Sequence, residues 1–188
     1  MYYGNAKSVR GAVHAAGLEP GQTVADLGFG GGLGLAELLA SVGASGHVYG
    51  IDASQTMVDA ARRRFRHEAT QGHLTIRRGD LTALPLGDAM LDASFVVNTL
   101  YFVDDLTPVF AELLRITRAG GVVVIGVADP AALAALPFTA HGFITRTPDE
   151  VNHYLTEAGF TGLRHERLGH DAGAFHLLVA QRPLLASA

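Results

Sequence analysis

Short runs of apolar residues alternate along this chain with longer segments in which apolar positions recur at helical spacing. The short runs predict strands at residues 23–27, 47–51, 74–78, 93–98 and 122–127. Helical spacing covers about residues 6–16, 36–42, the stretch after Ser54, 108–116 and 147–159. This alternation predicts an α/β fold in which helices cover both faces of a doubly wound, mostly parallel sheet.

Two final runs are predicted as strands, residues 163–168 and 174–181, and only residues 169–173 separate them. A crossover between parallel strands needs about a dozen residues or more, so these two runs must pair as antiparallel neighbours. The sequence therefore predicts one reversed strand near the end of the sheet.

Helix-capping residues stand before two of the predicted helices. Ser54 precedes one of them, and Thr147 precedes another together with Pro148 and Glu150. A capping hydroxyl, a proline at the first helical position and an acid in the first turn all favour a helix start. Both helices are expected to begin at these residues.

The length of 188 residues is typical of one domain. We expect a single domain over residues 1–188, in which residues 1–19 form an N-terminal helical segment. Residues 128–146 are the one long irregular stretch, and Asp129 followed by Pro130 favours a short helix at its start.

Composition and charge exclude several kinds of function. The chain has no cysteine, which rules out disulfides, thiolate zinc sites and cysteine nucleophiles. With 14 Lys and Arg against 18 Asp and Glu, the net charge of -4 gives no basic footprint for nucleic acid or an anionic membrane. The N-terminus has no apolar signal core, and no apolar stretch is long enough to span a bilayer. We expect a cytoplasmic protein that binds neither nucleic acid nor a membrane.

A glycine cluster, residues 28–34, follows the first predicted strand and leads into a helix. Glycines there permit positive φ and a close approach of the backbone to a ligand, and the first amides of the helix offer donors. The dinucleotide pattern G-x-G-x-x-G fails in both registers, because its last position falls on a leucine. The pattern D-x-G-x-G-x-G does match from Asp26 to Gly32, and its acid would repel a pyrophosphate and attract a cation. The sequence therefore favours a cationic nucleoside derivative as the ligand.

Two further acids stand at the ends of neighbouring strands. Asp52 ends the second predicted strand, and Asp80 follows the third. Open α/β sheets bind ligands at the carboxyl ends of their strands, where Asp52 can accept from ribose hydroxyls and Asp80 from an adenine amine. Each acid taken alone is also compatible with a turn or a helix cap.

Five segments of the chain, in their order and spacing, resemble the successive motifs of class I S-adenosylmethionine-dependent methyltransferases. The segments are VADLGFGGG, VYGIDASQTMV, RRGDLTALPL, LDASFVVNTLYFV and RAGGVVVIGV. The resemblance covers about residues 20–181 and is greatest to the small-molecule branch that includes the quinone-biosynthesis enzymes. It implies a seven-stranded, Rossmann-like sheet with the last strand inserted antiparallel. It also implies S-adenosyl-L-methionine as cofactor, S-adenosyl-L-homocysteine as product, and methyl transfer to a small-molecule acceptor by direct displacement.

The same resemblance implies which residues hold the methionine end of the cofactor. Asp26 and the loop of Gly28, Gly30 and Gly32 would border the methionine part. Asn98, which ends the fourth predicted strand, would lie beside the transferable methyl group.

Other residues are implied at the adenosine end. Asp52 would hold the ribose hydroxyls, and Ala53 and Met57 would lie near the adenosine. Asp80 and the backbone of Leu81 would bind the adenine.

A base is needed only where the acceptor is a hydroxyl, phenol or ammonium group that must lose a proton. The candidates that project from strand ends or from loops are His141, Tyr101, Tyr2, Tyr3 and His14. His141 is favoured among them because it lies in the irregular stretch 128–146, the candidate substrate segment, and because imidazole titrates near neutrality. A loop histidine without any catalytic role is the alternative. No two histidines have ligand spacing on one helix, so no metal is expected.

The chain departs from the family pattern at two places. Phe29 stands where a small residue or cysteine is common, which is expected to narrow the cleft. The segment 128–146 is shorter than the substrate-covering insertion of larger members. The arginines of the helix after Ser54, which are Arg62, Arg63, Arg64 and Arg66, are expected to be solvated.

Two other functions stay open at this point. A nicotinamide-dependent oxidoreductase would share the glycine loop and Asp52, but it should show G-x-G-x-x-G. A non-catalytic domain or subunit that binds S-adenosylmethionine would share every cofactor motif. The fourth-strand sequence NTLY lacks the two prolines of the amino-methylating DNA enzymes, which favours a small organic acceptor. A homodimer is compatible with the sequence.

Overall fold

The computed structural model describes residues 4–134, 143–169 and 174–184. A turn of 3₁₀ helix, Leu100–Phe102, follows the fourth strand. The other helices and strands, in chain order, are α1 (Gly4–Ala16), β1 (Thr23–Leu27), α2 (Leu33–Val42), β2 (His47–Asp52), α3 (Gln55–Arg64), α4 (Arg66–Thr70), β3 (Leu74–Arg78), β4 (Leu91–Val97), α5 (Thr107–Ile116), β5 (Thr117–Ala128), α6 (Pro130–Ala134), α7 (Pro148–Glu157), β6 (Thr161–Leu168) and β7 (Phe175–Gln181).

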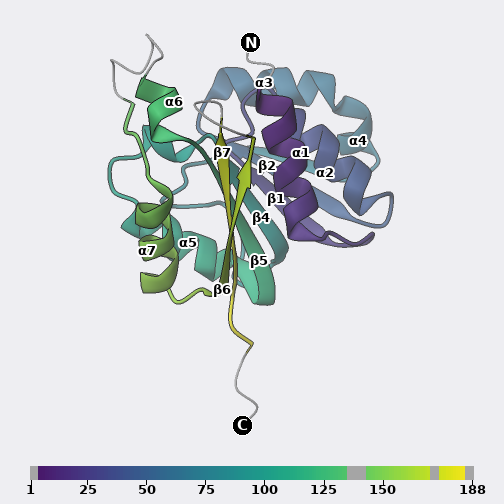
Figure 1. Cartoon of the computed structure of the whole chain (residues 1–188). Coiled ribbons are helices and arrows are strands. Elements are labelled where there is room, and N and C mark those ends of the chain that lie inside the picture. The colour runs from purple at the N-terminus through teal and green to yellow at the C-terminus, as the bar shows by residue number, and fades with distance from the viewer. Residues whose placement is uncertain (1–3, 135–142, 170–173, 185–188) are drawn as a thin grey trace.

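The described strands form one seven-stranded sheet in the order β3-β2-β1-β4-β5-β7-β6 (Figure 1). The pairs among β1 to β5 are parallel, whereas β7 runs antiparallel to both β5 and β6. This confirms the predicted doubly wound, mostly parallel sheet with one reversed strand. The reversal follows from the short connection between β6 and β7, which cannot cross over the sheet.

Helices cover both faces of the sheet. Figure 1 shows α1 to α4 on one face and α5 to α7 on the other. The central strands are therefore apolar on both sides: in β1, Val24 packs in the cluster under α1 to α3, and its neighbour Ala25 packs in the cluster under α5 and α7. Burial on both faces explains why these strands have mostly apolar sequences.

The predicted helix starts are confirmed. The side chain of Ser54 accepts from the backbone N–H of Met57 at the start of α3, at 3.4 Å. Thr147 accepts from Glu150 at the start of α7, at 3.1 Å. The short helix expected after Asp129 is α6, whose Ala131 N–H donates to the Asp129 carboxylate at 2.9 Å.

The sheet extends beyond three of the predicted strand starts. β4 begins at Leu91 rather than at residue 93, β5 at Thr117 rather than at residue 122, and β6 at Thr161 rather than at residue 163. The first residues of β5 carry no apolar run, and Thr117 joins the sheet through its pairing with Leu91 across an irregular register. A pairing partner far away in the sequence therefore decides where this strand begins.

The parallel pairing brings three loops to one edge of the sheet. β1 lies between β2 and β4, so the glycine loop, Asp52 and Asn98 all meet at the carboxyl ends of neighbouring strands. This edge is where open α/β sheets bind ligands. Within the described residues, no helix combines the length and the apolar character needed to cross a bilayer.

Candidate functional site

The loop between β1 and α2 is built on glycines in left-handed backbone conformations. Gly28, Gly30 and Gly32 have φ angles of 80°, 50° and 74°. Residues with a Cβ rarely adopt this region. At Gly28 a side chain would also overlap Thr99, which follows β4. Glycine is therefore needed here for two reasons: the backbone bends through left-handed conformations, and at Gly28 it passes close to Thr99.

The carboxyl group of Asp26 is buried beside this loop, and only 6% of the residue is exposed. Burial, and to a lesser extent the charge of Asp52, raises the pKa of Asp26 to about 7. No hydrogen bond and no cation among the described residues offsets these two effects. Gly34 of α2 makes room for the carboxyl group, because a Cβ there would lie 2.9 Å from the Asp26 Cγ. The carboxyl group would therefore gain from a cationic ligand, whose charge favours its ionised form.

Asp52 connects the glycine loop to the end of β2. One carboxylate oxygen, Oδ2, accepts from the backbone N–H of Gly30 at 2.8 Å, and the other, Oδ1, accepts from Ser54 N–H at 2.9 Å. A carboxylate has about four lone-pair sites, so both oxygens can accept further hydrogen bonds from a ligand.

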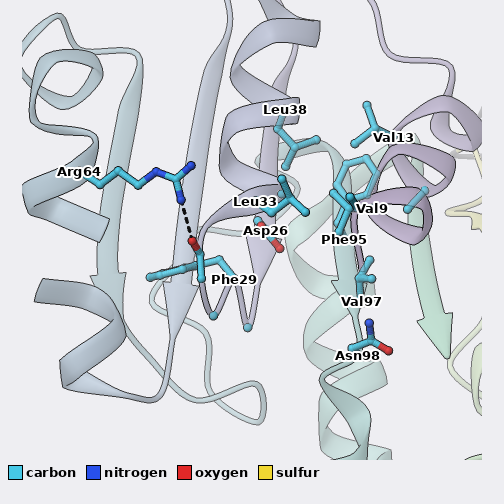
Figure 2. A pocket seen from close by; sticks show the side chains of 16 residues that line it. Val9, Val13, Asp26, Phe29, Leu33, Leu38, Arg64, Phe95, Val97 and Asn98 are labelled. Atoms are coloured by element: carbon cyan, nitrogen blue, oxygen red, sulfur yellow. Dashed lines mark hydrogen bonds between the residues drawn. The ribbon is translucent and has the colours of Figure 1, made fainter. Parts of the chain in front are cut away.

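A pocket of about 670 Å³ opens beside the glycine loop. Figure 2 shows how apolar side chains of α1, α2 and β4 surround the polar groups of Asp26 and Asn98. The residues that line it are Ala6, Val9, Ala12, Val13, Asp26, Gly28, Phe29, Gly30, Gly31, Leu33, Gly34, Leu38, Arg64, Phe95, Val97 and Asn98. The pocket thus has a polar floor at the strand ends and a mostly apolar wall under α1.

The pocket brings together part of the predicted cofactor site. Its lining includes Asp26, Gly28, Gly30 and Asn98. The other predicted residues lie outside this lining, and their roles stay predictions: Gly32, Asp52, Ala53, Met57, Asp80 and Leu81.

Asp80 caps a turn after β3. Its Oδ1 accepts from both the backbone N–H and the hydroxyl of Thr82, each at 2.8 Å. These hydrogen bonds lower the pKa of Asp80, although burial opposes them. The carboxylate is thereby held ionised, which suits an acceptor for an amine donor. Its role toward an adenine stays a prediction.

The candidate bases are placed very differently from one another. Tyr101 is buried in the turn after β4, and burial raises its pKa to about 12, although its hydrogen bond from the Ala128 N–H opposes the rise. His14 lies exposed in the last turn of α1. His141, Tyr2 and Tyr3 lie outside the described residues.

Arg64 belongs to the pocket lining and is also exposed, as the sequence predicted for these arginines. Its guanidinium donates to the carbonyl of Gly31 at 2.9 Å (Figure 2). It also lies over the ring of Phe65, 4.9 Å from the ring centroid. Arg64 reaches the pocket because α3 packs close to the glycine loop. Nothing local in the sequence distinguishes it from the adjacent arginines. Among residues 4–134, 143–169 and 174–184, no group of His, Asp and Glu side chains has the arrangement of a metal site.

Comparisons with known proteins agree with this geometry. A family model described as a methyltransferase domain matches residues 25–125. A curated protein from transposon TN4556 of Streptomyces fradiae, whose function is uncharacterised, is 33% identical over 82% of this chain and 44% of its own length. A demethylmenaquinone methyltransferase of Desulfitobacterium hafniense is 30% identical over 60% of this chain and 45% of its own length. The chain therefore spans less than half the length of these two relatives.

Solved structures share the fold. One is the complex of the Haloferax volcanii Trm112 methyltransferase activator with a proposed methyltransferase. It matches with a TM-score of 0.78 and 22% identity, over 96% of this chain and 90% of that one. Another is a Haemonchus contortus phosphoethanolamine N-methyltransferase 2 in complex with S-adenosyl-L-methionine. It matches with a TM-score of 0.77 and 15% identity, over 94% of this chain and 52% of that one. At these identities the similarity establishes the fold.

Proposed function

Because this chain belongs to the methyltransferase domain family, we propose that it transfers a methyl group from S-adenosyl-L-methionine to a small-molecule acceptor by direct displacement. The observation that carries the proposal is the buried carboxyl group of Asp26. It lies beside a glycine loop without any hydrogen bond or cation from the described residues to stabilise its charge.

The residues at the strand ends fit this cofactor. Its methionine part carries an ammonium group and a sulfonium, and a positive charge near Asp26 would favour the ionised carboxylate. The loop at Gly30 leaves open space for a ligand, because nothing lies within 4 Å of the position that a Cβ would take there. Asp52 presents both carboxylate oxygens, which suits a pair of ribose hydroxyls.

The remaining contacts are proposed from the motif positions. Ala53 and Met57, which follow β2, would lie along the adenosine. Asp80 and the backbone of Leu81 would meet the adenine. Asn98, at the end of β4 and in the pocket lining, would lie near the transferable methyl group.

When bound, the cofactor supplies a methyl group that is already activated on a sulfonium. The protein must then align the acceptor atom at about 3 to 3.5 Å and keep water away. Val9, Val13 and Phe95 form an apolar wall of the pocket. This wall supports both tasks, because it would exclude water and pack against an apolar part of the acceptor. We therefore propose a small organic acceptor with an apolar part.

A base is needed only for an acceptor that must lose a proton. We keep His141 as the candidate base. The pKa of Tyr101, raised to about 12, keeps that phenol protonated at neutral pH. A cytoplasmic location and a homodimer are also parts of this proposal, and the second is tested by the mass of the protein in solution.

The first experiment compares thermal unfolding with S-adenosylmethionine, S-adenosylhomocysteine, NAD and NADP. A ligand at a hundred times its dissociation constant adds about 2.7 kcal/mol, which for a chain of this size raises Tm by about 5 to 10 °C. We expect this rise with the two adenosyl ligands alone. A rise with NAD or NADP alone would overturn the assignment in favour of an oxidoreductase.

Turnover is tested by methyl transfer from S-adenosylmethionine to a panel of small acceptors, with Asp52→Ala as the cofactor-binding control. Transfer to an acceptor by the wild type and its loss in the variant would support an enzyme. Binding of the adenosyl ligands without transfer to any acceptor would instead favour a non-catalytic cofactor-binding domain.

A further inference from the structure

Tyr101 lies where the pocket, the end of β5 and the segment before α7 meet. Its hydroxyl accepts from the backbone N–H of Ala128 at 2.5 Å and lies 3.3 Å from Oδ1 of Asn98. Its backbone carbonyl accepts from Ile144 N–H at 2.9 Å, and its ring stacks on Phe143 with centroids 4.4 Å apart. One buried side chain therefore contacts a residue of the pocket lining and both described ends of the segment 128–146.

The hydrogen bonds of Tyr101 have a defined direction. A backbone N–H can only donate, so the phenolic oxygen accepts from Ala128 and keeps its single proton for another partner. Asn98 Oδ1 is within reach and accepts that proton. The phenol thus determines which end of the Asn98 carboxamide faces Tyr101.

Asn98 is held in an uncommon backbone conformation. Its φ is 59°, which residues other than glycine seldom adopt and which is concentrated at functional sites. Figure 2 shows its amide nitrogen directed toward Val97 and the oxygen turned away. With the oxygen on Tyr101, the nitrogen end of the carboxamide is directed toward the pocket that Asn98 lines.

Burial keeps Tyr101 in the form that this arrangement needs. Only 2% of the residue is exposed, and burial raises its pKa to about 12. The phenol is therefore a donor at neutral pH.

We propose that Tyr101 is a positioning residue of the transfer site, which orients the Asn98 carboxamide toward the pocket and anchors both described ends of the segment 128–146 to it. This role rests on the proposed function, because it concerns the same cofactor pocket. It replaces the predicted use of Tyr101 as a base.

A double-mutant cycle on the affinity for S-adenosylhomocysteine tests this role, with Tyr101→Phe, Asn98→Gly and the double variant. Phenylalanine keeps the ring stack and removes the hydroxyl, and glycine accepts the positive φ while it removes the carboxamide. A hydrogen bond of ordinary strength corresponds to about a 2- to 10-fold change in affinity. We expect Tyr101→Phe to weaken binding by this factor in the wild-type background and by less than about 2-fold beside Asn98→Gly.

Tyr154→Phe is the matched control, because Tyr154 lies half-buried on α7 and stacks on Phe110, outside the pocket lining. It should leave the affinity unchanged. A merely structural role of the Tyr101 hydroxyl would reduce affinity by the same factor in both backgrounds, and that result overturns the proposal. Unchanged affinity of Tyr101→Phe overturns it as well. A wild-type protein that binds no S-adenosylhomocysteine would instead overturn the proposed function, and the positioning role with it.

Discussion

The carboxylate of Asp52 accepts a hydrogen bond of 2.8 Å from the backbone N–H of Gly30, so an acid at the end of β2 holds the loop that follows β1. The two residues lie 22 positions apart in the sequence. The same carboxylate is the proposed acceptor for the ribose hydroxyls. A ligand bound to Asp52 would therefore contact the group that holds the glycine loop in place.

Replacing Asp52 by alanine should weaken cofactor binding. Hydrogen bonds to a charged acceptor are worth about 1.5 to 3 kcal/mol, so Asp52→Ala is expected to raise the dissociation constant of S-adenosylhomocysteine by about 10- to 150-fold. Calorimetric titration measures this change. The control is Asp59→Ala, because the Asp59 carboxylate accepts, among the described residues, from Gln55 in the same helix; this variant should bind as the wild type does. Unchanged affinity in folded Asp52→Ala would contradict the ribose assignment.

The stability of the ligand-free protein should depend on pH through Asp26. Its pKa in the folded protein, about 7, lies above the ordinary value of 3.8. In the folded state Asp26 therefore stays protonated up to a higher pH than in the unfolded state. The stabilising contribution is complete below about pH 4 and is lost as the pH rises through 7. Between pH 5 and pH 8 the wild type is expected to lose about 2 to 3 kcal/mol relative to Asp26→Asn.

Urea unfolding of the wild type and Asp26→Asn at both pH values gives this difference. Equal pH dependence in the two proteins would show that Asp26 is not the group that titrates. Addition of a saturating adenosyl ligand should reduce the loss, because a cation near the carboxyl group lowers its pKa again.

Substitution by alanine should lower the stability of the fold at Gly34 but not at the nearby Gly31. A Cβ at Gly34 would overlap the carboxyl group of Asp26, whereas at Gly31 no atom lies within 4 Å of that position. Overpacking of this kind costs about 1 to 3 kcal/mol, so Gly34→Ala should unfold at clearly lower urea concentration than Gly31→Ala. Equal stability of the two variants would mean that α2 can move away from Asp26 at little cost.

Arg146 should contribute more to the stability of the fold than an exposed ion pair does. The residue is 5% exposed, and its guanidinium donates to Glu150 at 2.6 Å and to the carbonyl groups of Val103 and Asp104. Its removal takes away a buried side chain and leaves the acceptors of three part-buried hydrogen bonds without their donor, so Arg146→Ala is expected to cost about 1 to 3 kcal/mol.

Arg10→Ala is the control for this prediction, because the exposed Arg10 pairs with Glu37 at the surface. Exposed pairs of this kind contribute little to stability, so this variant should unfold with the wild type. Similar losses in the two variants would contradict the special role of the buried guanidinium.

The sequence was sufficient for features that depend on near neighbours along the chain. The alternation of strands and helices, the caps at Ser54 and Thr147, and the reversal of β7 all follow from local pattern or from the length of a connection. The glycine loop could also be located, because its φ angles are a property of single residues.

Contacts between residues far apart in the chain could not be predicted from local sequence patterns. No pattern distinguishes Arg64 from the arginines beside it, but the packing of α3 brings it to Gly31. The early start of β5 likewise depends on Leu91, which lies in another strand.

The sequence by itself determined the order of the elements, the position of the glycine loop and the acids at the strand ends, because each is fixed by local conformational preference and by spacing. The tertiary structure decided what these groups can do. It removed Asp26 from water without giving it a partner among the described residues, and it made Tyr101 a hydrogen-bond donor to Asn98 rather than a candidate base. Burial and long-range hydrogen bonding set protonation and orientation, and both arise only when segments far apart in the chain pack together.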